Sequence, residues 1–270
     1  MIDWSRAVLG RTGREVGRLG ISATYGVPAS GVELAFEHGV NYLYFGTFRR
    51  GAFAQALRNL KPQRDRMFLV VQSYSRMASL IAPSLERALN RIGYDHADAL
   101  LLGMWNHQAY GRILDASRKL RERGLIRHIA LSTHHRPLIP ELAATDIDIF
   151  HVRYNAVHTG AEREVFPQLS PGESRPGIVA FTATSWGQLL KSKKAPDGGR
   201  FPTATDCYRS VMSNPAVDVC MTGPGTGQHV QDALKALQLG KMSDDEMAWM
   251  RRVGAAIYGP AKAAAGATAG

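Results

Sequence analysis

Short apolar runs of strand length alternate with amphipathic helical stretches through most of this 270-residue chain. Each run is rich in β-branched or large apolar residues, which is typical of parallel strands that are buried on both faces. This alternation constrains the fold more than any other feature of the sequence. It predicts strands over Leu19–Ala23, Tyr42–Phe45, Met67–Gln72, Ala97–Leu102, His128–Ser132, Ile149–Val152, Ile178–Phe181 and Val217–Met221.

The stretches between the runs have the periodicity of helices. In Ala78–Ile92 the apolar residues Ile81, Leu85 and Leu89 recur at helical spacing, while polar residues face the other way. Because no change of composition divides the strand–helix units, we predict one α/β domain over residues 1–260, a (β/α)₈ TIM barrel with a C-terminal helix. The other predicted helices cover Gly111–Arg123, Gln228–Leu237 and Asp244–Ile257.

An open, doubly wound sheet is the alternative architecture. It is disfavoured because no G-x-G-x-x-G motif follows the first predicted strand. Two segments look irregular. Lys191–Thr205 is rich in Lys, Pro and Gly and is predicted to be a loop, and Ala261–Gly270 is predicted to be a flexible Ala/Gly tail.

The chain is basic, with a formal charge of +10 and a pI near 9.9. Such a charge is compatible with nucleic-acid binding, with a pocket for an anionic ligand, or with an ordinary basic enzyme surface. The Lys and Arg residues are dispersed, and no run interleaves them with aromatic residues as single-strand binders do. We therefore expect a small-molecule ligand and no nucleic-acid partner.

The expected location is cytoplasmic, without membrane attachment. No stretch of about twenty apolar residues occurs, and the N-terminus lacks the basic-then-apolar pattern of a secretory signal. The only cysteines, Cys207 and Cys220, do not have metal-type spacing and fit a reducing compartment. The oligomeric state does not follow from the sequence.

Several strings resemble the aldo-keto reductase family, and they occur in that family's order from about Leu9 to Ile257. The resemblance implies the same barrel, with an N-terminal hairpin ahead of its first strand. The strings are Leu9-Gly10-Arg11-Thr12-Gly13, Gly39-Val40-Asn41-Tyr42, Leu85-Glu86-Arg87-Ala88-Leu89, Gly124-Leu125-Ile126-Arg127-His128, Tyr154-Asn155 and Thr222-Gly223-Pro224.

The resemblance also implies carbonyl reduction with NADPH or NADH. In that family a tyrosine protonates the carbonyl oxygen, a lysine paired with an aspartate lowers the pKa of that tyrosine, and a histidine orients the substrate. In this chain the four positions of this aspartate, tyrosine, lysine and histidine tetrad hold Tyr44, Arg49, Gln72 and Gly103. Because a lost general acid costs on the order of 10²–10⁴ in rate, we expect very weak or absent family chemistry.

The positions that the resemblance implies for the cofactor differ less from the family pattern than the four tetrad positions do. Ser132 and Thr133 stand at the site for the carboxamide, His151 stands where glutamine is usual, and Phe181 stands at the aromatic position that stacks on nicotinamide. A basic residue for the 2′-phosphate is missing, which leaves the choice between NADPH and NADH open. The phosphate turn is expected to use backbone N–H groups of Gly223, Gly225, Thr226 and Gly227.

Tyr44 has two interpretations: a relocated acid acting with Gln72, or a residue that fills the space of the lost aspartate–lysine pair. The expected substrate pocket is Arg49, Tyr74, Trp105 and His134, with Tyr74 on the same strand face as Gln72. Trp186 is expected to be structural.

Three function hypotheses remain open. The first is a divergent oxidoreductase, and the second is a catalytically silent protein that binds a dinucleotide or another anion. The third is a metal-dependent lyase or hydrolase, which would use the cluster His134, His135, His151 and His158. No metal site is expected, because acidic partners near these histidines are scarce.

Overall fold

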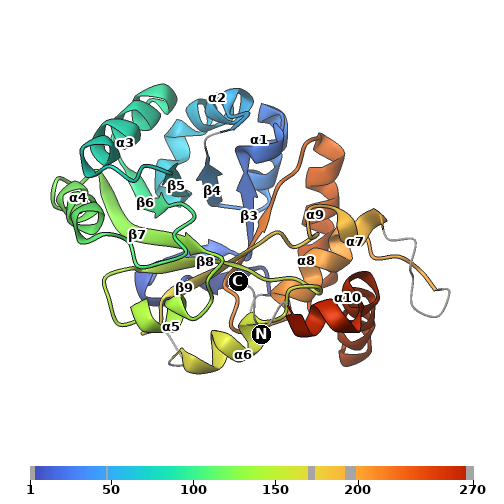
Figure 1. The fold of residues 1–270 in the computed structure, drawn as a ribbon. Helices are drawn as coiled ribbons and strands as arrows, with labels where there is room; N and C mark the ends of the chain where they lie inside the picture. The colour runs from blue at the N-terminus through green and yellow to red at the C-terminus, as the bar shows by residue number, and fades with distance from the viewer. Residues whose placement is uncertain (1–3, 47, 170–173, 192–198, 266–270) are drawn as a thin grey trace.

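Eight parallel strands form a closed barrel in the order β10-β3-β4-β5-β6-β7-β8-β9 (Figure 1). The computed structural model describes residues 4–46, 48–169, 174–191 and 199–265, with side chains up to residue 257. The predicted (β/α)₈ barrel is confirmed, and each predicted strand agrees with an observed one to within two residues at either end. The strands are β3 Leu19–Ser22, β4 Tyr42–Phe45, β5 Phe68–Ser73, β6 Ala97–Leu102, β7 Ile126–Thr133, β8 Ile149–Arg153, β9 Gly177–Phe181 and β10 Val219–Thr222.

The helices surround the barrel, and none in the described ranges is long and apolar enough to cross a membrane. The last helix continues to Ala265, so residues 261–265 of the predicted tail are helical, and 266–270 lie outside the described residues. The predicted loop Lys191–Thr205 overlaps two helix ends, and its residues 192–198 are not described. The helices are α1 Ala29–Glu37, α2 Gly51–Asn59, α3 Ala78–Ile92, α4 Gly111–Glu122, α5 Leu138–Leu142, α6 Ala161–Glu164, α7 Gln188–Lys191, α8 Ala204–Met212, α9 Gly227–Leu239 and α10 Asp244–Ala265.

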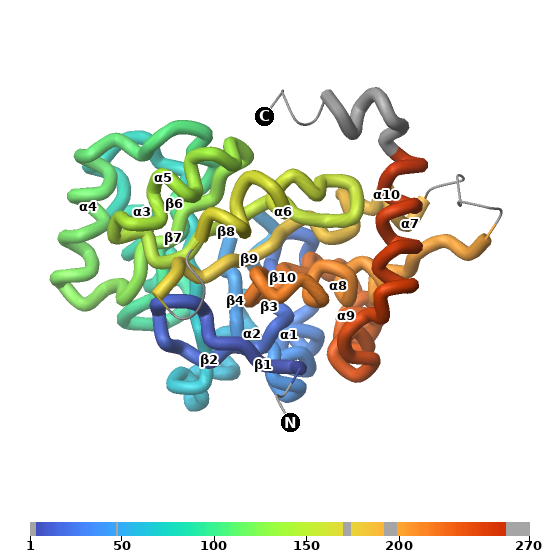
Figure 2. The backbone as a smooth tube through the Cα atoms, turned by 90° about the horizontal axis from the view of Figure 1, so that it is seen from below, coloured from blue at the N-terminus to red at the C-terminus, as the bar shows by residue number. Residues whose placement is uncertain are grey.

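An N-terminal hairpin closes the end of the barrel where the strands begin (Figure 2). Its strands β1 (Arg6–Val8) and β2 (Glu15–Gly17) pair antiparallel, as the family resemblance implied. Leu9, in the turn, is fully buried and packs with the barrel interior. Gly10 approaches the backbone so closely that a Cβ atom there would lie 2.4 Å from the Gly177 nitrogen. Only glycine fits this position, and the site must therefore lie at the opposite, open end.

Side-chain alternation divides the apolar residues into an interior core and an outer layer. In β4, Tyr42 belongs to the interior with Tyr44 packed against it, whereas Leu43 and Phe45 pack in the layer between sheet and helices. Above the filled interior, the inward-facing residues near the carboxyl ends of the strands line the barrel mouth. The interior residues are Leu9, Val16, Tyr42, Phe68, Val70, Ala99, Leu101, Ala130, Ile149, Val179, Val219 and Met221.

Carboxylates at the amino ends of three strands fix the register of their neighbours. Each accepts a hydrogen bond from a backbone N–H on the preceding strand in the sheet. The bonds run from Leu69 to Asp98 (2.8 Å), from Ile129 to Asp148 (3.1 Å) and from Ile178 to Asp218 (2.8 Å). An arginine pairs with each of these acids: Arg64 with Asp98 at 2.8 Å, Arg175 with Asp218 at 2.6 Å and Arg121 with Asp148 at 3.8 Å. This end of the barrel is thus held by polar contacts that are independent of the mouth.

Candidate functional site

A cavity of about 610 Å³ occupies the barrel mouth at the carboxyl ends of the strands. Its volume lies in the usual range for small-molecule sites. Among the described residues that line it, there is no Lys, Arg, Asp or Glu. The lining residues are Ser22, Thr24, Tyr25, Tyr44, Gln72, Tyr74, Leu101, Met104, Ser132, His134, His151, Phe181, Thr182, Ala183, Thr184, Trp186, Gly187, Leu190, Ala204, Tyr208, Met221, Thr222, Gly223 and His229.

Tyr44, Gln72 and Tyr74 all line this cavity, and strand alternation had predicted a shared face for Gln72 and Tyr74. The Tyr44 hydroxyl donates a hydrogen bond to Oε1 of Gln72. Burial raises the pKa of Tyr44 well above its usual range, and the phenol of Tyr74 beside it raises that pKa further. The Tyr44 proton is therefore held at neutral pH and directed at an amide oxygen. No ammonium group lines the described cavity to stabilise the phenolate.

Gly103 leaves room for this cluster. A Cβ atom at Gly103 would lie 2.6 Å from Nε2 of Gln72 and 2.7 Å from the ring of Tyr74. Contacts that short do not occur between side chains, so any larger residue would displace one of the two. The glutamine and Tyr74 therefore fill the space beside the position where the family resemblance places a histidine.

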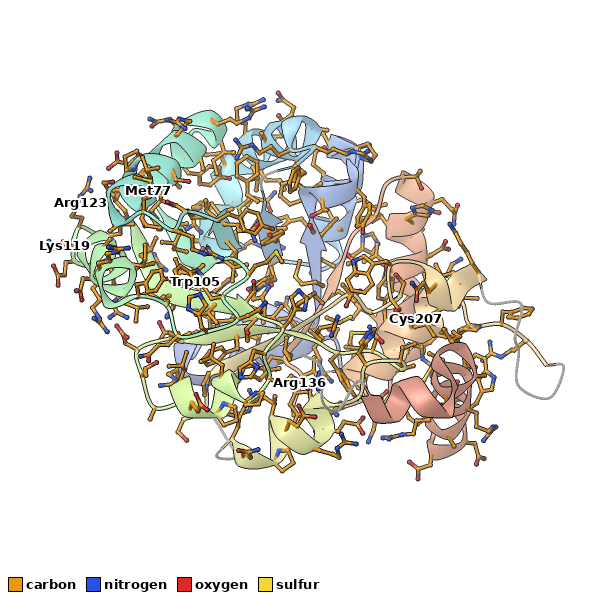
Figure 3. The ribbon with its side chains drawn as sticks, viewed as in Figure 1. Met77, Trp105, Lys119, Arg123, Arg136 and Cys207 are labelled. Carbon is orange, nitrogen blue, oxygen red and sulfur yellow. The ribbon has the colours of Figure 1, made fainter. Side chains whose placement is uncertain are left out.

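Two expected pocket residues, Arg49 and Trp105, do not line the cavity. Arg49 has a positive φ of 44° on the turn after β4, and its side chain is exposed. Met104, with a φ of 55°, breaks the strand alternation after β6, so Met104 lines the cavity while Trp105 turns back into the outer layer. Trp105 lies near α3 and α4 (Figure 3), with the Arg76 guanidinium 4.0 Å from its ring centre. The periodicity of a strand gives no information about a positive φ in the loop that follows it, so these two side-chain directions could not be predicted.

His151 lies deep in the cavity and bonds to the barrel interior. Its Nε2 lies 2.8 Å from the hydroxyl of Tyr42, which is fully buried. Burial lowers the pKa of His151 to about 3, so the ring is neutral at pH 7. The hydrogen bond of its ring to the described residues is made through Nε2, and the His151 side chain lines the cavity.

Two residues, Ser132 and Thr133, were predicted to form the carboxamide site, and of these Ser132 lines the cavity. The Ser132 Oγ lines it and accepts a hydrogen bond of 2.8 Å from Met104 N, which leaves its O–H able to donate to a ligand. Thr133 follows on the outward face of β7 and does not line the cavity. Its hydroxyl oxygen instead accepts a hydrogen bond of 2.9 Å from His135 N. Period-two alternation excludes two adjacent strand residues from one face.

The expected phosphate turn is partly occupied by its own neighbours. The ring of Tyr25 lies against Gly223, where a Cβ atom would be 2.6 Å from it. The Gly225 N–H donates to Nδ1 of His229 at 3.3 Å, and the Thr226 hydroxyl oxygen caps α9 by accepting from His229 N at 3.2 Å. Gly223 and His229 line the cavity, whereas Gly225, Thr226 and Gly227 do not. No cationic side chain of the described lining faces this turn.

His134 reaches the cavity, as expected, with its ring edge-on to Phe181 at a centroid distance of 5.5 Å. Burial and, next, the charge of Arg153 lower the pKa of His134. His135 and His158 do not line the cavity. Within the described ranges, no group of three or more His, Cys, Asp or Glu residues is arranged to hold a metal ion.

The aromatic residues at the rim are what the sequence reasoning missed. Trp186, expected to be structural, lines the cavity and is 53% exposed. Tyr25 and Tyr208 also line it and were not singled out. Trp186 lies in a glycine-containing loop that follows the carboxyl end of a strand. Barrel enzymes build their sites from such loops, so this position in the sequence could have indicated that Trp186 lines the cavity.

A closed eight-stranded barrel with its cavity at the carboxyl ends of the strands is a (β/α)₈ barrel with a candidate site at the end where such barrels carry their sites. The model of the Aldo/keto reductase family matches residues 30–206, well over half of the chain. The chain therefore belongs to the aldo-keto reductase family, an oxidoreductase family whose members generally bind NAD(P)H.

Solved structures share the fold. Aldo-keto reductase AKR11C1 from Bacillus halodurans superposes in its holo form with a TM-score of 0.77 at 17% identity, covering 92% of this chain and 95% of that one. The apo form gives a TM-score of 0.75 at 18% identity with the same coverage. No curated protein sequence matches the chain.

Proposed function

We propose that this protein is a ligand-binding member of the aldo-keto reductase family in which ordinary carbonyl reduction is very weak or absent. The observation that carries the proposal is the hydrogen bond from Tyr44 to Gln72. A phenol whose proton is held by an amide, with its pKa raised by burial, is a poor general acid at neutral pH. Gln72 also cannot supply the positive charge that would favour the phenolate.

The residues at the mouth fit one half of a nicotinamide dinucleotide better than the other. Ser132, His151 and Phe181 offer a hydroxyl, an imidazole ring and an aromatic face where a nicotinamide would lie. The phosphate half has no Lys or Arg among the described lining, and Tyr25 covers Gly223 at the turn. The described residues therefore do not fit the whole cofactor, and we derive no hydride-transfer step through it.

A relocated-acid reaction at Tyr44 is the competing function. It is supported by the position of Tyr44 on the cavity wall beside Gln72 and Tyr74. It is opposed by the direction of the Tyr44 hydroxyl and by the absence of a cation in the described lining. We therefore favour binding over catalysis.

Two measurements test the proposal. NADPH and NADH are titrated by quenching of protein fluorescence, and a panel of aldehydes and ketones is assayed for oxidation of either nucleotide. We expect weak binding with no preference for NADPH, because the described lining offers no cation to a 2′-phosphate. Turnover with kcat of about 1 s⁻¹ or more, which is ordinary for enzymes, would refute the proposal.

If such turnover were found, the variant Tyr44→Phe would decide between mechanisms. A loss on the order of 10²-fold or more would assign Tyr44 as the acid, whereas an unchanged rate would place the chemistry elsewhere. Tyr110→Phe is the matched control, because Tyr110 is an exposed tyrosine that does not line the cavity.

A further inference from the structure

A second cavity, of about 300 Å³, lies beside the N-terminal hairpin at the amino end of the barrel (Figure 2). Its volume is at the lower end of the range for small-molecule sites. It shares no described lining residue with the cavity at the barrel mouth, so the two are separate sites. We call it the hairpin pocket, and its lining residues are Arg6, Arg14, Glu15, Phe36, Gly39, Asn41, Asp65 and Arg66.

Three guanidinium groups border the hairpin pocket, against two carboxylates. Arg6 belongs to β1, Arg14 directly precedes β2, and Arg66 ends the segment before β5. Arg6 and Arg14 are half-buried, whereas Arg66 is exposed. The carboxylates, Glu15 and Asp65, are both exposed. Separate segments of the chain therefore bring an excess of positive charge to one small cavity.

Two of these arginines are held in place by neutral groups. Nη2 of Arg14 donates to two backbone carbonyl oxygens, each at 3.3 Å. Nη1 of Arg66 donates to Oε1 of Gln63, and its guanidinium lies 5.1 Å from the ring centre of Phe36. No carboxylate among the described residues forms an ion pair with either arginine. Their positions are fixed while their charge is not neutralised, so both can bind an anion.

The third arginine has a weak partner and open space beside it. Arg6 pairs with Glu15 at 3.6 Å, and these side chains are 38% and 68% exposed. An ion pair so exposed contributes little, so an oxyanion can compete with Glu15 for the guanidinium. A Cβ atom at Gly39 would lie 3.9 Å from Nη2 of Arg6, and the positive φ of 87° at this position favours glycine. Residue 39 therefore leaves the space beside Arg6 open to a ligand.

Asn41 holds the walls of the hairpin pocket together. This residue is 8% exposed. Its Nδ2 donates to the backbone oxygen of Arg66 at 3.0 Å, and its Oδ1 accepts from Gly17 N of β2 at 2.8 Å. The segment that carries Arg66 is thus tied to the hairpin that carries the other two arginines. Walls that are positioned before a ligand arrives lower the entropic cost of binding it.

We propose that the hairpin pocket binds a small polyanion with two linked phosphate groups, either free pyrophosphate or the diphosphate of a larger molecule. Guanidinium groups bind phosphate oxygens through parallel N–H donors, and three of them can share the charge of a diphosphate. The formal charge of +10 on the chain favours the approach of such an anion. The inference goes beyond the proposed function and does not depend on it, since it concerns the opposite end of the barrel.

The test is isothermal titration calorimetry of the full chain at neutral pH and constant ionic strength. We expect inorganic pyrophosphate to bind at least about tenfold more tightly than inorganic phosphate, because its second phosphate group forms further charge-assisted hydrogen bonds. The double variant Arg14→Ala/Arg66→Ala is expected to weaken pyrophosphate by at least about tenfold. The matched control is Arg87→Ala/Arg91→Ala, which removes two exposed arginines of α3 that do not line the pocket. It should change the affinity by less than about twofold.

The variant Glu15→Gln tests the site in the opposite direction. It removes an exposed carboxylate and frees Arg6, so we expect pyrophosphate to bind about threefold more tightly. Near-ultraviolet circular dichroism of each variant checks that the fold is intact. Unaltered or weaker binding by a folded Glu15→Gln protein would count against the inference.

Titration with ADP distinguishes the two sources of the diphosphate. ADP binding that weakens in the Arg14→Ala/Arg66→Ala variant indicates an esterified diphosphate, whereas such weakening for pyrophosphate alone indicates the free ion, and either result supports the inference. It is overturned if pyrophosphate does not bind, if it binds no more tightly than phosphate, or if the control variant loses as much affinity as the pocket variant. None of these outcomes bears on the proposed function, which fails only on turnover of carbonyl substrates.

Discussion

The Tyr44 hydroxyl donates a hydrogen bond to Oε1 of Gln72 across the neighbouring strands β4 and β5. The family resemblance implies an aspartate and a lysine at these positions, and on that expectation a neutral pair stands in place of an ion pair. Either charge alone would be buried without a partner, and replacing both together avoids that penalty. The replacement also removes the group that would make a nearby phenol acidic.

Removing the Tyr44 hydroxyl is expected to have a modest effect on stability. Tyr44→Phe should lower the free energy of unfolding by about 1 kcal/mol, because one hydrogen bond is lost while the Gln72 oxygen faces the cavity and can bind water. Urea denaturation measures the change. Tyr110→Phe should change stability by less than about 0.5 kcal/mol. A loss well above 3 kcal/mol for Tyr44→Phe would contradict this account of the pair.

Restoring the family histidine at position 103 is expected to destabilise the barrel. In Gly103→His the new Cβ would lie 2.6 Å from Gln72 Nε2 and 2.7 Å from the Tyr74 ring, which should cost about 1–3 kcal/mol. Adding Tyr74→Ala should recover part of this loss, as a double-mutant cycle measures. The control is Gly111→Ala at the start of α4, where nothing lies within 4 Å of the added atom. An unchanged melting temperature for Gly103→His would show that the cluster is loosely packed.

The buried acid Asp98 is expected to contribute to stability far from the mouth. It accepts from Leu69 N and pairs with Arg64, and it is 1% exposed. Asp98→Ala should therefore cost roughly 2–3 kcal/mol by leaving a backbone donor and an arginine without their partner. Asp65→Ala, at an exposed carboxylate, should change stability by less than about 0.5 kcal/mol. Ligand binding at the cavity should be unaffected in both variants.

His151 is expected to make the protein sensitive to acid. Its pKa is about 3 in the folded state, below the ordinary value of 6.5 that applies once the chain unfolds. Between these values the unfolded chain binds a proton that the folded chain does not, so stability falls as the pH falls from 6.5 towards 3, by up to about 1.4 kcal/mol per pH unit.

Replacing this histidine by the family glutamine should remove that contribution. His151→Gln keeps a hydrogen-bonding partner for Tyr42, and we expect it to lose less stability than the natural chain when urea denaturation is moved from pH 7 to pH 5. His38→Gln, on the surface, controls for loss of a histidine. Equal pH dependence of the natural and His151→Gln proteins would mean that His151 is not buried as a neutral ring.

Strand and helix positions could be predicted from the sequence because they depend on local periodicity. Gln72 and Tyr74 were predicted to share one face by strand alternation, and both line the cavity together with Tyr44. Arg49 and Trp105 were misplaced because each lies at or next to a positive-φ turn beyond its strand end. No periodicity governs such turns, so the direction of their side chains cannot be extrapolated.

The sequence by itself determined the barrel and its family, since these follow from patterns that repeat along the chain. Only the tertiary structure decided how the side chains at the barrel mouth contact one another. The direction of the Tyr44 proton, the packing beside Gly103 and the exposure of Trp186 depend on atoms from different strands and loops meeting at one point. Contacts of this kind are set by packing in three dimensions, and no single segment of the chain encodes them.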